Sequence, residues 1–466
     1  MSPLRELNEQ ELIDYLTAQR WYGSKAREVA RASIVDHVEL PGLLLALVEI
    51  VFPEGTHEVY QLLAGETLDG LAEPAVAREL VHLIRTGNPQ RTAGDGTVEF
   101  HHVEGFAGLG AELIDARAND AEQSNSSVVF DDALFLKSFR RLEPGMNPEL
   151  EMLRFLTEHG FGNIPPLGGW YSYVGPPLEA TLGILLEFVP NALDGWELAL
   201  DELVGAPDRF LDRLRRLGEV TGTMHATLAS DPSDPNFAPE HPSLESLGLL
   251  TASVDEDIEQ VFLSLPEDLD ALEPIIGRGE EVRERLRQLT HAGTTGMAIR
   301  NHGDLHLGQT LCTGPRLETP SARPPAPGRE PSGTPAASPG DWIILDFEGE
   351  PARSLAERRR KRSPLRDVAA MLRSFAYATS AAGFLRGAEA PPRWEEGARA
   401  EFLDGYLETV DPTIVPAGRE QFDKLLAVFE LEKAVYELRY ELSMRPDWLP
   451  IPVAGILRML EEPVTL

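Results

Sequence analysis

Short alternating runs of apolar and polar residues fill the first part of the chain and predict small strands mixed with helices. Asn8 followed by Glu11 forms a capping-box pattern at the start of an amphipathic helix. Alternation on both sides of Pro41–Gly42 predicts a hairpin, and apolar residues on one side of 74–86 predict a helix. We expect residues 1–90 to form a separate α/β subdomain, with strands at 33–39 and 43–52.

The pattern is β-rich from about 95 to 190 and helical afterwards. Asn147–Pro148 opens one helix that Gly160 closes. The predicted strands are 98–103, 128–130, 133–139 and 182–188. The later helices are predicted at 196–203, 210–228, 254–263, 279–289, 366–382, 398–410 and 422–444. This order predicts an α+β, two-lobed enzyme, with a β-rich intermediate subdomain over 91–190 and a helical lobe over 191–466.

One segment breaks the pattern. Thr313 to Gly340 consists mainly of Pro, Gly, Ser, Thr and Ala and has almost no large apolar side chains. Such a composition cannot bury a core. We expect a flexible surface insertion over 313–340.

Composition narrows the class of partner and the compartment. The 466 residues carry 42 Lys and Arg against 76 Asp and Glu, a formal net charge of −34. This balance argues against general binding of nucleic acid or of an anionic membrane. Cys312 is the single cysteine, which excludes an internal disulfide framework, and the longest apolar run, 43–48, is too short to span a bilayer. A cytoplasmic protein is expected, with neither nucleic acid nor membrane as partner.

The stretch His302-Gly-Asp-Leu-His-Leu-Gly-Gln309 and the later Ile343-Ile-Leu-Asp346-Phe-Glu carry the most specific chemistry. Phosphoryl transfer from ATP needs a carboxylate beside the acceptor hydroxyl. It also needs an amide oxygen and a second carboxylate to hold Mg²⁺. The two stretches supply these groups in that order. A rival interpretation is a metallohydrolase, because His302, Asp304 and His306 offer three metal-binding groups within five residues.

Together these stretches resemble the aminoglycoside-phosphotransferase-like branch of the protein-kinase fold. The resemblance implies that Asp304 is the catalytic base, that His302 orients the loop, and that Asp346 binds magnesium. Gln309 stands where this branch usually has Asn. Because its amide oxygen remains available, we expect Gln309 to be a magnesium ligand as well.

The same fold requires groups that hold ATP upstream. Lys137 is a lone charge in an apolar strand and needs a buried partner. The helix that follows offers Glu149 and Glu151, and we choose Glu151, one turn into the helix. Four small polar residues are expected to cover the phosphates, and two residues at the exit of strand 182–188 to line the adenine hinge: Ser124, Asn125, Ser126, Ser127, Glu187 and Val189.

Further motifs resemble actinobacterial maltokinases across almost the whole chain. They are QRWYGSK at 19–25, EQSNSS at 122–127, ILDFEGEP at 344–351, and FELEKAVYELRYE with RPDWLPIP over 429–452. The resemblance implies an N-terminal cap subdomain. It also implies phosphorylation of maltose by ATP and Mg²⁺ at the anomeric hydroxyl, giving maltose 1-phosphate for α-glucan synthesis. Chains of this kind also occur fused to trehalose synthase, so a complex with that enzyme, or a non-catalytic role beside it, is a further hypothesis.

The C-terminal helix is the expected sugar site. The proposed substrate-binding residues are Glu430, Lys433, Tyr436, Glu437, Tyr440, Glu441, Arg445 and Trp448. Carboxylates accept hydrogen bonds from sugar hydroxyls, and aromatic rings cover the C–H face of a sugar ring. Periodicity alone favours an ordinary solvated, charged helix face, and only the resemblance to maltokinases reverses that preference. The nearest alternative substrate is glucosamine, and the basic run Arg353 to Arg362 has no assigned role.

Overall fold

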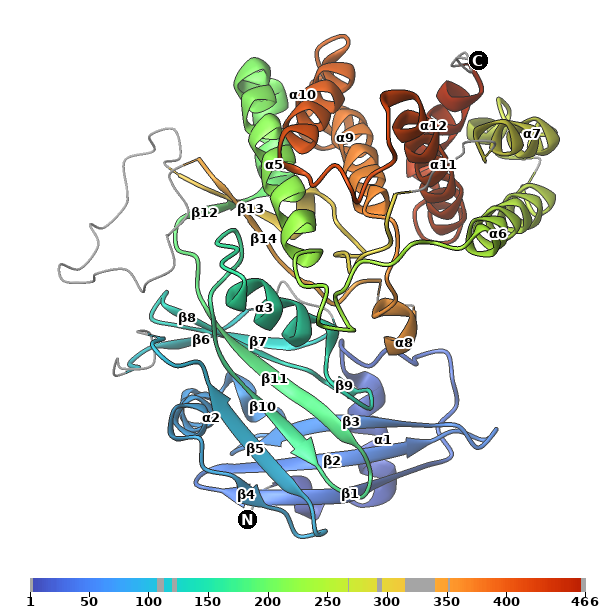
Figure 1. Ribbon diagram of the computed structural model, residues 1–466. Coiled ribbons are helices and arrows are strands. Elements are labelled where there is room, and N and C mark those ends of the chain that lie inside the picture. Colours follow the sequence, from blue (N-terminus) through green and yellow to red (C-terminus); the bar gives the residue numbers. More distant parts are fainter. Residues whose placement is uncertain are drawn as a thin grey trace. The chain divides into compact units, whose positions relative to one another are not determined.

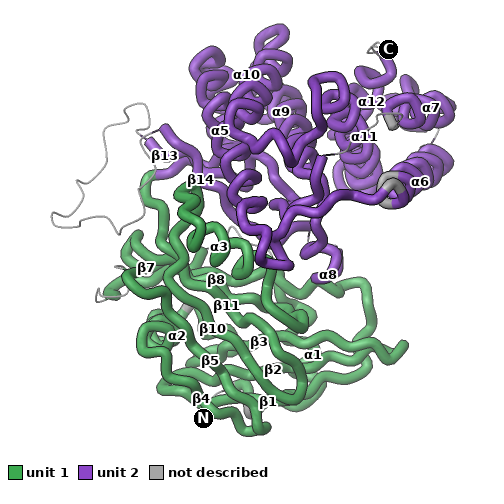
Figure 2. Tube along the Cα trace, in the orientation of Figure 1, with its two compact units in different colours: residues 1–191, 317–336 green, residues 192–316, 337–466 purple. Residues whose placement is uncertain are grey.

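The computed structural model describes residues 3–106, 113–119, 124–266, 268–290, 296–314, 340–350 and 353–461. These residues form two compact units (Figure 2). Unit 1 runs to Asn191 and unit 2 begins at Ala192. The predicted subdomain boundary near residue 90 stays a prediction, as do the other domain limits.

The first sheet of unit 1 is antiparallel, with the order β1-β2-β3-β9 (Figure 1). Its strands are Arg31–Leu40, Leu43–Val51, His57–Ala64 and Arg141–Leu142. Helix α1 (Glu9–Ala18) starts with the predicted capping box of Asn8 and Glu11. The predicted hairpin is also confirmed, with Gly42 in the left-handed region at φ 72°.

The second sheet of unit 1 has seven strands in the order β4-β5-β10-β11-β8-β7-β6. The strands in chain order are Gln90–Arg91, Thr97–His102, Ala116–Asn119, Ser126–Phe130, Leu134–Ser138, Leu167–Val174 and Glu179–Glu187, numbered β4 to β8, β10 and β11. Helix α2 (Pro74–Thr86) packs on β5, and α3 (Pro148–Glu158) follows β9. Both helices are confirmed, whereas β3 and β10 are absent from the sequence-based prediction.

Unit 2 is mainly helical. In chain order its helices α4 to α12 are Gly195–Gly205, Pro207–Leu228, Leu244–Leu263, Gly279–Thr290, Leu355–Arg358, Leu365–Arg386, Trp394–Thr409, Arg419–Met444 and Pro450–Glu461. A small sheet, β12-β13-β14, spans Ala192–Asp194, Thr310–Thr313 and Trp342–Ile344. The helical second part is confirmed; α12 and the short α8 were not predicted.

Helix packing in unit 2 uses two local devices. Helices α6 and α7 lie beside α11 over a continuous apolar core (Figure 1). Where α5 crosses α10, a Cβ at Gly218 would lie 2.0 Å from the carbonyl oxygen of Phe402, and one at Gly405 equally close to that of Arg215. The two glycines therefore permit a backbone approach that no larger residue allows.

Helix α9 is the one described helix whose length and apolarity match a membrane span. Of its most apolar window, 61% is buried inside the protein, as in the core helix of a globular unit. The predicted insertion falls mostly on 315–339, outside the described residues. Its flanks are described: the Thr313 N–H donates to the Asp341 carbonyl at 2.8 Å and closes the β13–β14 pair.

Candidate active site

Ile299 and Arg362 form an isolated antiparallel β-bridge, and the loop that follows Ile299 carries His302 and Asp304. Hydrogen bonds from the backbone N–H groups of this loop hold it in place. The N–H groups of His302 and Gly303 donate to the carboxylate of Asp367 at 2.8 and 2.9 Å. Gly303 has φ 87°, a conformation that suits glycine. The loop geometry is thus fixed from helix α9, through a residue that the sequence analysis did not single out.

Asp367 belongs to a buried network. Nε2 of His225 lies 3.0 Å from its carboxylate, and Nδ1 of His225 lies 3.1 Å from the hydroxyl of Tyr406. Burial acts to raise the pKa of Asp367, but the hydrogen bond and charge from His225 outweigh it, and the pKa is lowered. The signal in the sequence was a lone carboxylate in the apolar helix 365–386.

His302 connects the loop to the segment after β14. Its Nε2 donates to the Leu345 carbonyl at 2.7 Å, while its Nδ1 accepts the Asp304 N–H at 3.3 Å. The ring also contacts Phe347, with centroids 4.9 Å apart. Both ring nitrogens are therefore engaged, which argues against the metallohydrolase interpretation, because that interpretation needs His302 as a metal ligand.

The two predicted magnesium ligands lie together. Nε2 of Gln309 donates to the carboxylate of Asp346 at 3.0 Å, and the Leu345 N–H donates to the Gln309 carbonyl at 2.9 Å. Asp346 has φ 60°, a left-handed backbone conformation that is uncommon for residues other than glycine. An ion held by both side chains requires the Gln309 amide to turn and present Oε1 in place of Nε2.

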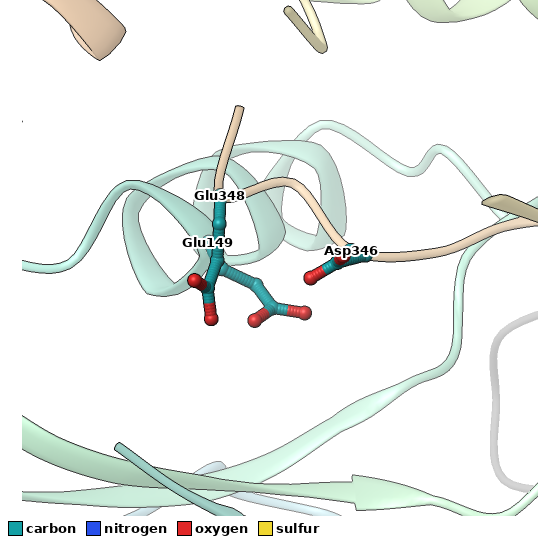
Figure 3. A group of neighbouring side chains, drawn as sticks. All are labelled: Glu149, Asp346 and Glu348. Carbon is teal, nitrogen blue, oxygen red and sulfur yellow. The ribbon is translucent and has the colours of Figure 1, made fainter. Parts of the chain in front are cut away.

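Glu348 adds a second carboxylate two residues after Asp346. Figure 3 draws both side chains in the loop after β14 of unit 2, together with Glu149 of helix α3 in unit 1. Carboxylate and amide oxygens are the ligands that Mg²⁺ prefers. The donor set after β14 therefore fits that ion, and Glu348 is a candidate that the sequence analysis overlooked in the motif DFEGE.

Asp304 faces a lysine. Nζ of Lys433, on α11, lies 3.5 Å from Oδ1 of Asp304. Burial acts to lower the pKa of Lys433, but the neighbouring carboxylates of Asp304, Glu350 and Glu437 outweigh it, and the pKa is raised. The lysine is thus held as a cation beside the predicted base.

A cavity of about 780 Å³ in unit 2 contains Asp304 in its wall. Seven of the eight predicted sugar-binding residues line it: Lys433, Tyr436, Glu437, Tyr440, Glu441, Arg445 and Trp448. Lining residues outside the prediction include Trp196, Glu350 and Tyr377. Ligand sites commonly measure about 300–1,000 Å³, so the cavity has the size of a small-molecule site.

Aromatic side chains cover one side of this cavity. The rings of Tyr377 and Trp448 stack with centroids 6.1 Å apart, and the Arg445 guanidinium lies 4.9 Å from the Trp448 ring. Tyr377 also donates to Glu441 at 3.0 Å. A rigid aromatic wall beside hydrogen-bonding groups is typical of carbohydrate sites.

Glu437 and Glu441 both form ion pairs. Nε and Nη2 of the buried Arg373 donate to Glu437 at 3.0 and 2.7 Å. Arg445 donates to both oxygens of Glu441, at 2.9 and 2.7 Å. The two carboxylates are consequently fixed in orientation before any ligand arrives.

Glu430 does not line the cavity, contrary to the prediction. It is buried and accepts both Nη atoms of Arg399, from α10, at 2.6 and 2.9 Å. It shares a helix face with Glu437, but seven residues separate them, about 10 Å along the axis at ~1.5 Å per residue. Glu430 is not among the residues that line the cavity, and it pairs instead with an arginine of the packing helix α10.

In unit 1, Lys137 is buried in β8 and pairs with Glu149, with Nζ 2.8 Å from Oε2. The choice of Glu151 was therefore wrong. Two residues on a helix differ by about 200° in direction, so Glu149 and Glu151 cannot both face the strand. Asn147, the N-cap, accepts the Glu149 N–H and fixes the start of α3.

The other predicted ATP-binding residues lie at strand ends of the same sheet. Ser124 and Asn125 precede β7, Ser126 accepts a hydrogen bond from Arg140 at 2.7 Å, and Ser127 pairs with Lys137 across the strands. Glu187 ends β11 and Val189 follows, both half-buried. Their roles toward ATP stay predictions.

Residues 15–99 match the maltokinase N-terminal cap domain. The glucosamine kinase of Streptacidiphilus jiangxiensis is 26% identical over 422 residues, covering 83% of this chain and 86% of that protein. The glucosamine kinase of Mycolicibacterium smegmatis is 26% identical over 355 residues, covering 73% of this chain and 78% of its own.

A solved structure, glucosamine kinase in complex with glucosamine, ADP and inorganic phosphate, superposes with a TM-score of 0.69. Its identity is 19%, and the match covers 96% of this chain and 98% of that chain. This likeness establishes the fold, so the predicted α+β, kinase-like architecture is confirmed. Together with the cap-domain match over residues 15–99, the comparisons show that the chain is similar to maltokinases and glucosamine kinases.

Proposed function

We propose that the protein is a sugar kinase that phosphorylates maltose at the anomeric hydroxyl with ATP, giving maltose 1-phosphate and ADP. The observation that carries the proposal is the placement of Asp304 in the wall of the 780 Å³ cavity, beside the aromatic and carboxylate side chains of the C-terminal helix. A hydroxyl bound there lies next to a base. The glucosamine kinases among the relatives support the wider class of substrate.

The charges of the cavity favour a neutral sugar. Each of its four carboxylates has a cationic partner: Asp304 with Lys433, Glu350 with Arg353, Glu437 with Arg373 and Glu441 with Arg445. The ammonium group of an amino sugar needs an uncompensated carboxylate to offset its loss of water. Neutral hydroxyls need only acceptors and donors, which these pairs provide.

The roles of the chain's own residues follow from their positions. Asp304 accepts the proton of the attacking hydroxyl, and His302 holds the loop against Leu345. Lys137, oriented by Glu149, binds the ATP phosphates. Asp346, Gln309 and Glu348 hold Mg²⁺, which supplies compensation for the negative charge of the phosphates.

The test is ADP release measured with maltose, glucose, glucosamine and trehalose as acceptors. We expect the highest kcat/KM with maltose. Glucosamine is the second candidate, because two similar proteins are glucosamine kinases. A preference for glucosamine would reject the charge argument and leave the kinase assignment intact. No ADP release with any sugar, together with co-purification with trehalose synthase, would favour the non-catalytic hypothesis.

A further inference from the structure

A second cavity in unit 2, of about 330 Å³, adjoins the sugar cavity and shares Glu350, Lys433 and Tyr436 with it. It is unusual for a chain of net charge −34 because arginines dominate its walls. They are Arg353, Arg358, Arg360, Arg362, Arg366 and Arg439. Most of them come from the basic run to which the sequence analysis gave no role.

The carboxylates of this cavity neutralise only part of that charge. Glu432 pairs with Arg366 at 2.9 Å, Glu350 with Arg353, and Asp257 with Arg439 at 3.7 Å. Glu357 instead accepts hydrogen bonds from the N–H and hydroxyl of Ser354. Among the described residues, neither Arg360 nor Arg362 forms an ion pair, so an excess of positive charge remains.

Of the two arginines without an ion pair among the described residues, Arg362 has a backbone that is held in place. Its backbone exchanges two hydrogen bonds with Ile299, at 2.8 and 2.9 Å, three residues before His302. Its side chain is half-buried, and burial, with the nearby charges of Arg366 and Arg353, lowers its pKa to about 10. Crowding of like charges in a partly dry site destabilises the cation unless an anion joins it.

A neighbouring arginine is held in place as well. The Arg366 guanidinium lies 4.9 Å from the centroid of the Phe429 ring, and Phe429 and Tyr436 add apolar surface to the walls. Guanidinium forks match the oxygens of a phosphate group, and a stacked guanidinium loses little freedom on binding.

We propose that this cavity binds a small oxyanion, inorganic phosphate or the phosphoryl group of a sugar phosphate, with Arg362 as the main contact and Arg366 beside it. This cavity adjoins the sugar cavity and shares Lys433 with it, but neither Asp304 nor Asp346 lines it. It goes beyond the proposed reaction, because neither ATP nor the acceptor sugar is assigned to it.

The test is thermal unfolding of the full chain, saturated with ADP and Mg²⁺ so that phosphate cannot occupy the α- and β-phosphate positions of the nucleotide. Phosphate bound at the open γ position would be insensitive to Arg362→Gln. Inorganic phosphate is titrated against chloride at equal ionic strength, since a ligand of the folded state raises Tm. We expect a rise in the wild type and an apparent phosphate affinity at least tenfold weaker in Arg362→Gln. Arg419→Gln is the control: it removes the same positive charge from an exposed surface ion pair, and it should behave as the wild type.

Equal phosphate effects in Arg362→Gln and the wild type would overturn the proposal, as would no difference between phosphate and chloride in the wild type. If Arg362→Gln does not fold, Arg362→Lys replaces it; this variant keeps the charge, loses the fork, and should weaken phosphate binding several-fold. Glucose 1-phosphate, with glucose as the neutral control, separates the two sources of the anion. Tighter binding than phosphate, lost in Arg362→Gln, identifies a sugar phosphate, and equal binding identifies phosphate.

Discussion

Two buried glutamates on α11 allow the effects of a substitution on the stability of unit 2 and on sugar binding to be distinguished. Glu430 pairs with Arg399 away from the sugar cavity, whereas Glu437 pairs with Arg373 in its wall. Removal of one member of a buried ion pair typically costs about 3–5 kcal/mol, because the other charge is left uncompensated. The same substitution at the two positions should therefore have different kinetic effects.

We expect Glu430→Ala to lower the free energy of unfolding by about 3–5 kcal/mol with an unchanged KM for the sugar. Glu437→Ala should destabilise similarly and also raise that KM about 10-fold or more, since a charge-assisted hydrogen bond contributes about 1.5–3 kcal/mol. Urea denaturation and steady-state kinetics on both variants measure this. A raised sugar KM in Glu430→Ala would contradict its placement outside the cavity.

Asp304→Asn tests the base. The amide keeps the size of the side chain but cannot accept a proton, so turnover should fall by about 10²–10⁴. Affinity for ATP, measured by calorimetry, should stay near the wild-type value. Turnover close to that of the wild type would remove Asp304 from the catalytic role.

Asp367 makes the stability of unit 2 depend on pH. Its pKa is lowered in the folded state, so its carboxylate stabilises the protein above the unfolded-state pKa of about 3.9. This contribution is lost as the pH falls from there through the lower, folded-state pKa. Asp367→Asn should therefore be less stable than the wild type at pH 7, with a difference that shrinks below pH ~4. Urea denaturation of the two proteins at pH 7 and below pH ~4 measures this difference in stability. A difference that widens in acid would contradict the prediction.

At the scale of an element, helix α3 directs the side chains of Glu149 and Glu151 to different sides of its axis. Glu149 pairs with Lys137, so Glu149→Gln removes the ion pair and leaves only a neutral hydrogen-bond acceptor. The KM for ATP should rise about tenfold, the effect of ~1.4 kcal/mol. Glu151→Gln is the matched control, on the same helix turn and with the same change of charge, and should leave the KM for ATP nearly unchanged. The reverse result would restore the sequence-based choice of Glu151.

The pairing of β13 with β14 leads to a second prediction at this scale, on the removal of residues 315–339. Because Thr313 and Asp341 are already hydrogen-bonded, removal of 315–339 leaves a short closed turn. Loop closure depends only weakly on length, so kcat and Tm should change little. A large loss of turnover in the shortened chain would show that the removed residues serve the active site or a partner.

Local sequence signals predicted the elements well where one cap or one turn decides them. Asn8 with Glu11, Pro41–Gly42 and Asn147–Pro148 each mark a boundary that the structure confirms. The ion-pair partners were not predictable in this way. Arg373 lies 64 residues before Glu437, so only the packing of α9 against α11 brings them together.

At the scale of the whole molecule, each unit has a hydrophobic core of its own. In unit 1 it joins Leu12, Leu16 and Tyr22 to the first sheet, and in unit 2 it joins α6, α7, α11 and α12. Composition predicted a chain long enough for such cores but not the uneven placement of charge. An arginine-lined cavity lies in a strongly acidic protein, and total composition carries no information on such local placement.

The buried Asp367 network has a consequence for hydrogen exchange. The His302 and Gly303 amides donate to a carboxylate that α5 and α10 enclose through His225 and Tyr406. A surface loop ordinarily exchanges its amide hydrogens through small local openings. His302 is buried, so its amide should exchange only when the loop separates from α9, and its protection should approach that of the unit 2 helices. Gly303 is exposed, so its amide should exchange faster. The start of the loop that carries the proposed base would then be among the last parts of unit 2 to open.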